Sequence, residues 1–346
     1  MFLKNNNGII LDQVKEPAFS RDLLPFLSSS PQGANSWAPV EDIESLSLKQ
    51  VMDLAQRAGI IDENNSKPLA ERLKKWAKTP PTAVVGDAID DEPYVSSQVN
   101  PLLKLSQEAA GGLRILQKAL GAPKAYFAVY KEMYDLNTKV PSKVEGFPVV
   151  KIGGRYPMEQ RAISRLGRDT LLLGCGALIH LYRAAVKGQP QTTCFVTVAG
   201  NCIGNPANLE VTIGTTVAQV LERCGLIQDP TYIVSGGAMK GKPVLEPENT
   251  IIQVGTRAVL AFRENRKERQ YTCIGCGRCL EVCPSGLNPA LLYQALRDRR
   301  GVTAQKLGLS RCIGCSTCSY ICPSKLNLSH TIFEANIKKK RGEENE

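Results

Sequence analysis

Eight of the twelve cysteines lie in two matching runs in the last quarter of the chain, and this repeat limits the possible folds more than any other feature. The runs cover residues 273–284 and 312–323, and both read C-x2-C-x2-C-x3-C-P. Zinc sites use four sulfurs that usually come as two pairs, whereas each run is a triplet followed by a fourth cysteine. A disulfide framework is typical of short secreted chains, and this chain has 346 residues.

The spacing within each run is that of bacterial ferredoxins, which hold [4Fe–4S] clusters. Three close thiolates bind three irons of one cluster. The fourth cysteine, which proline follows, ligates the other cluster of the pair. The sequence therefore predicts two clusters that exchange their fourth ligands. Cluster 1 takes Cys273, Cys276, Cys279 and Cys322, and cluster 2 takes Cys312, Cys315, Cys318 and Cys283.

Charge and hydropathy limit the partners and the location. A formal net charge of +10 favours acidic redox proteins or an anionic membrane surface as partners. Nucleic acid is not an expected partner, because no binding motif is present and the basic residues are spread widely. No apolar run approaches the ~20 residues that span a bilayer, and the N-terminus lacks the apolar segment of a signal peptide. Together with oxygen-sensitive clusters, these features predict a cytoplasmic protein.

The chain divides by pattern into five parts. They are an irregular N-terminal arm (1–45), an α/β domain (46–190), a β-grasp region (191–262), a two-cluster ferredoxin-like helical domain (263–335) and a charged tail (336–346). In the α/β part we expect strands at 82–85, 125–130 and 147–152 and helices at 47–60, 68–77, 99–120 and 170–187. In the β-grasp part we expect strands at 194–200, 209–213, 232–237, 250–254 and 258–262. We also expect a helix over 217–224 that Thr215 or Thr216 caps.

The remaining cysteines and both histidines are expected to have structural roles. Cys175, Cys194, Cys202 and Cys224 show no paired spacing, and isolated cysteines are commonly buried small residues. His180 lies in an apolar stretch and is predicted to pack in the core. His330 follows the second run, and neither histidine is predicted to be a ligand.

Several segments outside the cysteine runs carry a family resemblance. The chain resembles the C subunit of the Rnf electron-transport complex (RnfC-like proteins). That group also includes the cobalamin reductase of propanediol-utilisation microcompartments and the proline-reductase electron-transfer protein. The matching segments occur in family order from about residue 50 to 330. They are 84–94, 112–121, 155–157, 196–200 with 205–206, 236–239 and the two cysteine runs.

The resemblance implies an α/β domain like the NADH-binding subunit of complex I, followed by a soluble-ligand-binding (SLBB-like) β-grasp module. In the family a glycine-rich loop of the type A-G-I-V-G-x-G-G-A-x-F-P holds FMN, and in some members NADH also binds. The matching stretch here, 58–68, keeps the leader Ala-Gly-Ile-Ile but has Asp62, Glu63, Asn64 and Asn65 in place of the glycines. Two carboxylates repel a phosphate by about 4 kcal/mol per pair of unit charges at ~4 Å. We therefore expect FMN to be absent, with Glu92, Pro93 and Tyr94 remaining as a vestigial flavin site.

Three functions remain open at this point. The first is a carrier that passes single electrons through two [4Fe–4S] clusters between a donor and a partner oxidoreductase or complex. The second is an FMN-dependent NADH oxidoreductase that feeds the clusters, and the third is a docking scaffold of a redox complex. The expected partners are redox proteins, including an acidic flavodoxin- or ferredoxin-like donor. The resemblance places the chain in the cytoplasm, peripheral to a membrane complex or inside a microcompartment.

Overall fold

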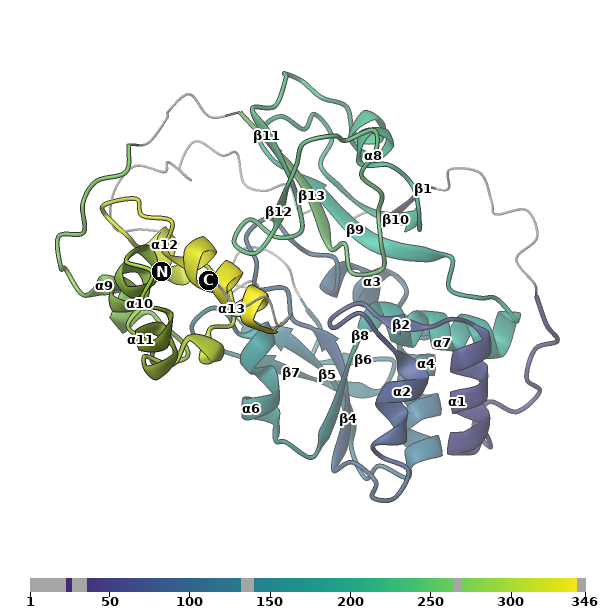
Figure 1. Ribbon diagram of the computed structural model, residues 1–346. Coiled ribbons are helices and arrows are strands. Elements are labelled where there is room, and N and C mark those ends of the chain that lie inside the picture. The colour runs from purple at the N-terminus through teal and green to yellow at the C-terminus, as the bar shows by residue number, and fades with distance from the viewer. Residues whose placement is uncertain (1–22, 27–35, 132–139, 264–268, 341–346) are drawn as a thin grey trace. The chain divides into compact units, whose positions relative to one another are not determined.

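The computed structural model describes residues 23–26, 36–131, 140–263 and 269–340 (Figure 1). The chain divides into two compact units. One comprises Met1–Ala238 with Lys242–Arg263, and the other comprises Met239–Gly241 with Glu264–Glu346. Separate sets of buried apolar side chains form the cores of the two units.

The first unit contains a five-stranded sheet. Its order is β6 (Lys143–Val144), β7 (Phe147–Ile152), β5 (Ala125–Tyr130), β4 (Ala83–Ala88) and β8 (Thr170–Gly174). The last four strands run parallel, and β6 pairs antiparallel with β7. Strands β4, β5 and β8 are almost wholly buried, as expected for parallel strands that helices cover on both faces.

Helices cover both faces of this sheet (Figure 1). The core on one face includes side chains from α1 (Leu48–Arg57), α4 (Ser106–Leu120) and α7 (Cys175–Lys187). The core on the other face includes α6 (Ala162–Leu166), which follows the short helix η2 (Glu159–Arg161). Helices α4 and α7 approach closely at Gly112, where a Cβ would lie 2.0 Å from the Leu178 carbonyl oxygen.

Three helix predictions in this unit were wrong in their bounds. The stretch predicted as one helix over 170–187 is strand β8 followed by helix α7, because Thr170–Gly174 pairs with β4. The stretch predicted as one helix over 99–120 is α3 (Val99–Lys104) and α4, separated by a break at Leu105 (φ −115°, ψ 40°). Helix α2 (Leu69–Lys74) begins after Pro68 rather than at it. It follows a small two-stranded sheet of β2 (Ile61–Asp62) and β3 (Lys67–Pro68).

A second, six-stranded sheet completes this unit. Its order is β1 (Leu23–Phe26), β10 (Ala207–Thr212), β9 (Thr193–Ala199), β13 (Ala258–Phe262), β11 (Tyr232–Ser235) and β12 (Lys242–Val244). Strands β9 and β10 form the predicted antiparallel hairpin, and β13 runs parallel to β9. Helix α8 (Val217–Cys224) begins as predicted, with Thr216 and Gln219 forming a reciprocal capping box.

The structure corrects two expectations about this sheet. The N-terminal arm is not wholly irregular, because β1 pairs in parallel with β10; the arm's residues 1–22 and 27–35 lie outside the described residues. The strand expected at 250–254 does not form. Ile251 makes only an isolated bridge with Thr216.

The second unit is helical over residues 269–340. It contains α9 (Arg278–Glu281), α10 (Pro289–Arg297), α11 (Gly301–Lys306), η3 (Leu309–Arg311), α12 (Thr317–Tyr320) and α13 (Leu328–Lys340). The two cysteine runs repeat in backbone as well as in sequence. Matching positions take positive φ values in both runs, at Gly275 and Gly314 (68° each) and at Gly277 and Ser316 (73° and 62°). Helix α13 continues into the segment predicted as a charged tail.

Candidate metal centre and buried polar network

The structure brings the last cysteine of the first run to the triplet of the second run. One cavity is lined by Cys283 together with Cys312, Cys315 and Cys318. Apolar side chains from the core of the same unit, Leu287, Leu292 and Ile332, form part of its wall. The cavity therefore contains the four thiols that the sequence predicts for cluster 2.

The last cysteine of the second run lies near the start of the first run. The Tyr271 amide donates to the Ser324 carbonyl oxygen at 2.9 Å, and the Ser324 hydroxyl donates to the Thr272 carbonyl oxygen at 2.9 Å. Thr272 directly precedes Cys273, and Ser324 follows Cys322 by two positions. These bonds hold together the two segments that supply the predicted ligands of cluster 1. The assignment of individual ligands stays a prediction.

The chemistry of the thiols suits a cationic cluster. Burial raises the pKa of Cys318 to about 12, and the neighbouring thiols Cys315, Cys312 and Cys283 act in the same direction. Crowded buried thiols become thiolates when a metal supplies the compensating positive charge. The Leu287 amide donates to Cys283 Sγ at 3.3 Å, and the Thr317 hydroxyl donates to Cys315 Sγ at 3.3 Å. Such bonds tune the potential of an iron–sulfur cluster.

Within the described ranges, no group of three or more His, Cys, Asp or Glu side chains is arranged to hold a single metal ion. The cysteine set has a different geometry, because each thiolate of a [4Fe–4S] cluster binds its own iron. The residues present therefore fit a cluster of this kind, with four thiols around the cavity of the second run.

The predicted vestigial flavin residues lie in the first unit, where they contact protein groups. Glu92 is buried and accepts a hydrogen bond from the Tyr156 hydroxyl at 2.8 Å. Tyr94 takes a left-handed backbone conformation (φ 68°), and its ring lies edge-on to Phe262 at 5.1 Å between centroids. Pro93 lies between them and is half-buried. The three residues are consecutive in the sequence, and Glu92 and Tyr94 contact other side chains of the protein.

The loop expected to have lost its flavin caps the N-terminus of α7. The Glu63 carboxylate accepts from the amides of Gly176 (2.6 Å) and Ala177 (3.1 Å). Asp62 Oδ1 accepts from the Gly174 amide at 3.2 Å. A Cβ on Gly174 or Gly176 would lie 2.3 or 2.7 Å from Glu63 Oε1, so these glycines make room for the carboxylate. Burial raises the pKa of Glu63, and its amide hydrogen bonds act in the opposite direction.

A helix N-terminus with free amides is an ordinary site for a phosphate. At α7 the four amides from Gly174 to Ala177 all have side-chain acceptors, because Gln98 Oε1 accepts from the Cys175 amide at 3.0 Å. A phosphate bound at this helix end and the Glu63 carboxylate would need the same amides. The residues at this helix end therefore do not fit the phosphate of FMN.

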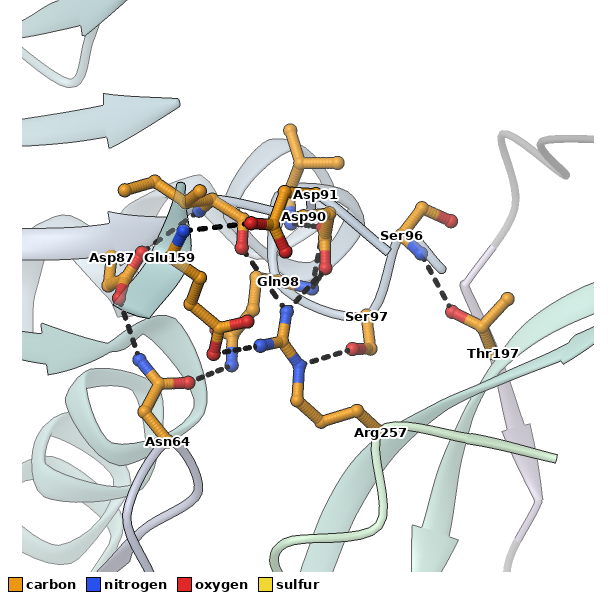
Figure 2. A network of polar contacts seen from close by, with 12 residues as sticks. Asn64, Asp87, Asp90, Asp91, Ser96, Ser97, Gln98, Glu159, Thr197 and Arg257 are labelled. Atoms are coloured by element: carbon orange, nitrogen blue, oxygen red, sulfur yellow. Dashed lines mark hydrogen bonds and ion pairs between the residues drawn. The ribbon is translucent and has the colours of Figure 1, made fainter. Parts of the chain in front are cut away.

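Arg257 is the centre of a buried polar network that connects the second sheet to the loop after β4 (Figure 2). Its guanidinium pairs with Asp90 Oδ1 at 2.6 Å and with Glu159 Oε1 at 2.5 Å, and it donates to Ser97 Oγ at 3.3 Å. Burial raises the pKa of Asp90, and Arg257 opposes that rise. Burial would lower the pKa of Arg257, but the carboxylates of Glu159 and Asp90 raise it above its usual value.

Asp87 extends the network toward the loop that replaces the glycines. Asn64 Nδ2 donates to Asp87 Oδ2 at 2.9 Å, and Gln98 Nε2 donates to Asn64 Oδ1 at 3.0 Å (Figure 2). Burial raises the pKa of Asp87 well above its ordinary value, and the carboxylate of Glu159 adds to the rise. Asp62 of the substituted loop is thus buried and Asn64 is half-buried and hydrogen-bonded within the protein, whereas Asn65 is exposed.

Sequence reasoning did not single out Arg257, Gln98 or Glu159. Arg257 precedes an apolar strand and carries no motif of its own. Its importance comes from partners that lie roughly a hundred or more positions away. A pattern in one sequence does not reveal such distant pairs.

The predictions for the isolated cysteines and His180 are confirmed. Cys175, Cys194, Cys202 and Cys224 are buried free thiols. His180 is buried and stacks on Phe195 at 6.0 Å, and its Nε2 has no hydrogen-bond partner. Burial lowers the pKa of His180 to about 4, so the ring is neutral at physiological pH. His330 is exposed on α13.

Family models match two segments of the chain. A 4Fe-4S dicluster domain model matches residues 272–326, and an SLBB domain model matches residues 195–242. The class of protein that these segments define is an iron–sulfur protein with an SLBB domain.

The chain is similar in sequence to curated proteins of one kind, the C subunits of redox complexes. It is 28% identical over 318 residues to the C subunit of the ion-translocating oxidoreductase complex of Rhodobacter capsulatus, covering 83% of this chain and 60% of that protein. It is 26% identical to the C subunit of the proton-translocating ferredoxin:NAD(+) oxidoreductase complex of Clostridium ljungdahlii, covering 72% and 59%. The predicted resemblance to the Rnf C subunit is confirmed. The chain spans about 60% of the length of these relatives.

Solved structures share the fold at low sequence identity. Two structures of an NAD+-reducing [NiFe]-hydrogenase contain a similar chain. In the air-oxidized state the TM-score is 0.52 at 13% identity, with 86% of this chain and 55% of that chain covered. In the H2-reduced state it is 0.56 at 11% identity, with 87% and 64% covered. At these identities the likeness concerns the fold alone. In the described part of the chain, no helix is long and apolar enough to cross a membrane.

Proposed function

We propose that this protein passes single electrons through two [4Fe–4S] clusters, between a redox donor and a partner oxidoreductase complex. The observation that carries the proposal is the cavity in which Cys283 of the first run meets Cys312, Cys315 and Cys318 of the second. An exchanged fourth ligand is a property of two-cluster ferredoxins and has no purpose in a pair of separate zinc sites. When bound, the clusters supply one-electron chemistry, and the protein's residues hold and tune them.

The relatives support a place in a membrane-bound redox complex. They are named as C subunits of ion-translocating or ferredoxin:NAD(+) oxidoreductase complexes. We propose that this chain is a peripheral subunit of such a complex on its cytoplasmic side, with redox proteins as partners. The same relatives offer no support for a microcompartment.

We further propose that the chain does not hold FMN and does not oxidise NADH on its own. Glu63 occupies the amides at the α7 N-terminus, and the neighbouring carboxylate of Asp62 accepts from Gly174. Two of the relatives are named as subunits of ferredoxin:NAD(+) oxidoreductase complexes, so an FMN-dependent NADH oxidoreductase is the main alternative. The absorbance of an acid-released supernatant decides between the two: near-equimolar flavin would make the oxidoreductase interpretation the leading one.

The carrier function is tested by metal analysis of protein purified under anaerobic conditions. We expect about eight iron and eight sulfide per chain. The reduced protein should show signals of two interacting clusters in electron paramagnetic resonance and should return its electrons to an artificial acceptor. About four iron, or stoichiometric zinc, would contradict the two-cluster proposal. A protein with full clusters that exchanges no electrons with any acceptor would favour the scaffold interpretation.

A further inference from the structure

The two cysteine runs have the same sequence pattern and backbone turns but differ in what covers them. Residues 271–277, at the start of the first run, are all exposed, including Cys273 and Cys276, whereas Cys279 of that run is buried. In the second run the matching Cys315 is 9% exposed and Cys312 is half-buried. The exposed fractions of the matching isoleucines differ in the same direction, at 69% for Ile274 in the first run and 37% for Ile313 in the second.

Helix α13 is the physical reason for this difference. Phe333 on α13 lies over the second run, so a Cβ on Gly314 would meet its ring at 2.7 Å. Asn336, one turn further along α13, donates through Nδ2 to the Cys312 carbonyl oxygen at 3.0 Å. At the matching position of the first run, a Cβ on Gly275 would meet nothing within 4 Å. Helix α10, which follows the first run as α13 follows the second, ends at Arg297.

The surface beside the first run is both apolar and basic. Tyr271 and Ile274 are large exposed apolar residues on either side of Cys273, with exposed fractions of 62% and 69%. Arg269 and Arg278 flank this segment in the sequence. Over residues 269–338 the unit contains nine Lys and Arg residues against three Asp and Glu. An apolar centre with a charged surround is the usual form of a protein–protein interface, and its positive charge complements an acidic partner.

We propose that residues 271–277, the first-run face, are the surface through which the clusters exchange electrons with an acidic redox protein. The second run, covered by α13, then holds the cluster further from that partner. This inference rests on the proposed electron-transfer function, and it names the face and the charge of the partner.

The test uses the full protein with both clusters loaded and a low-potential flavodoxin, an acidic FMN protein, as the probe. Ile274→Ser and Ile313→Ser form a matched pair, since they remove the same side chain from equivalent positions of the two runs. We expect Ile274→Ser to raise the Kd for the flavodoxin by about fivefold or more, as for an apolar contact at an interface centre, and Ile313→Ser to change it less than about twofold. The wild-type Kd should also rise with ionic strength.

Hydrogen exchange on the wild-type protein provides a second measurement that does not depend on a variant folding. The flavodoxin should protect amides in 271–278 and leave 310–317 unchanged. Equal effects of the two substitutions, protection of 310–317 alone, or no binding of the flavodoxin would overturn the inference. Iron and sulfide counts distinguish failure of the proposed docking face from failure of the proposed electron-transfer function. Full clusters with no preference for the first run refute only the docking face, whereas missing clusters refute the proposed function itself.

Discussion

Replacing Arg257 with Gln removes the cation from the buried network of Figure 2 and leaves its carboxylates without compensation. Arg257 pairs with Asp90, which is 1% exposed in its side chain, and with Glu159, which is 14% exposed. Removing one partner of a buried ion pair typically costs about 3–5 kcal/mol. Against a domain stability of about 5–15 kcal/mol, this is a large share of the free energy of unfolding.

The stability that Arg257→Gln loses relative to wild type should increase with pH. Burial already raises the folded-state pKa of Asp90, and Arg257 opposes that rise, so the variant should raise it further. Between the unfolded carboxyl pKa of about 4 and this raised folded value, the folded state binds more protons than the unfolded state. Stability therefore falls as pH rises through that window. The deficit of the variant relative to wild type should be smaller at pH 5 than at pH 8.

Tryptophan fluorescence during urea unfolding measures the stability of the unit that contains Arg257, because both tryptophans, Trp37 and Trp76, lie in this first unit. Arg223→Gln is a matched control at an exposed position of the same unit and should change the free energy of unfolding by less than about 0.5 kcal/mol. The double variant Arg257→Gln/Asp90→Asn should recover part of the lost free energy of unfolding, because it removes the buried Asp90 charge that no longer has a cationic partner. A loss below about 1 kcal/mol, or an equal loss at both pH values, would refute the reasoning.

Three further predictions concern the clusters, the α7 N-terminus and the buried histidine. Cys283→Ser should damage the second-run cluster and Cys322→Ser the first-run cluster, as spectra of each variant will show; a serine that harms only the cluster of its own run contradicts the exchanged ligands. Glu63→Ala should cost about 1–2 kcal/mol in urea unfolding by uncapping α7, and Glu71→Ala, in the first turn of α2, should cost clearly less; equal losses would contradict the capping role. The pKa of His180 is lowered to about 4, so the wild-type free energy of unfolding should fall by up to about 3 kcal/mol as pH decreases from 6.5 to 4. A His180→Phe variant should lose less stability over that range. If the free energies of unfolding of the two proteins change equally with pH, protonation of His180 is not the cause.

The sequence alone determined the features that depend on short-range spacing. The ligand pattern of each cysteine run fixes a loop whose turns recur in both copies, because three thiolates must approach one cluster within a few residues. The cap of α8 at Thr216 was predictable for the same reason, since the capping box joins residues three positions apart. The buried strands β4 and β5 were recognisable as apolar runs.

Only the tertiary structure decided the features that depend on distant partners. The stretch from Thr170 to Gly174 became strand β8 because β4 pairs with it, although its apolar residues suit a helix equally well. From the sequence, Glu63 was expected only to repel a phosphate. In the structure its carboxylate caps α7, which begins more than a hundred positions later. The two cysteine runs share their spacing, and the contacts that Phe333 and Asn336 of α13 make with the start of the second run have no counterpart at Gly275 of the first. Side chains far apart in the chain meet through packing, and local sequence patterns do not encode which of them will meet.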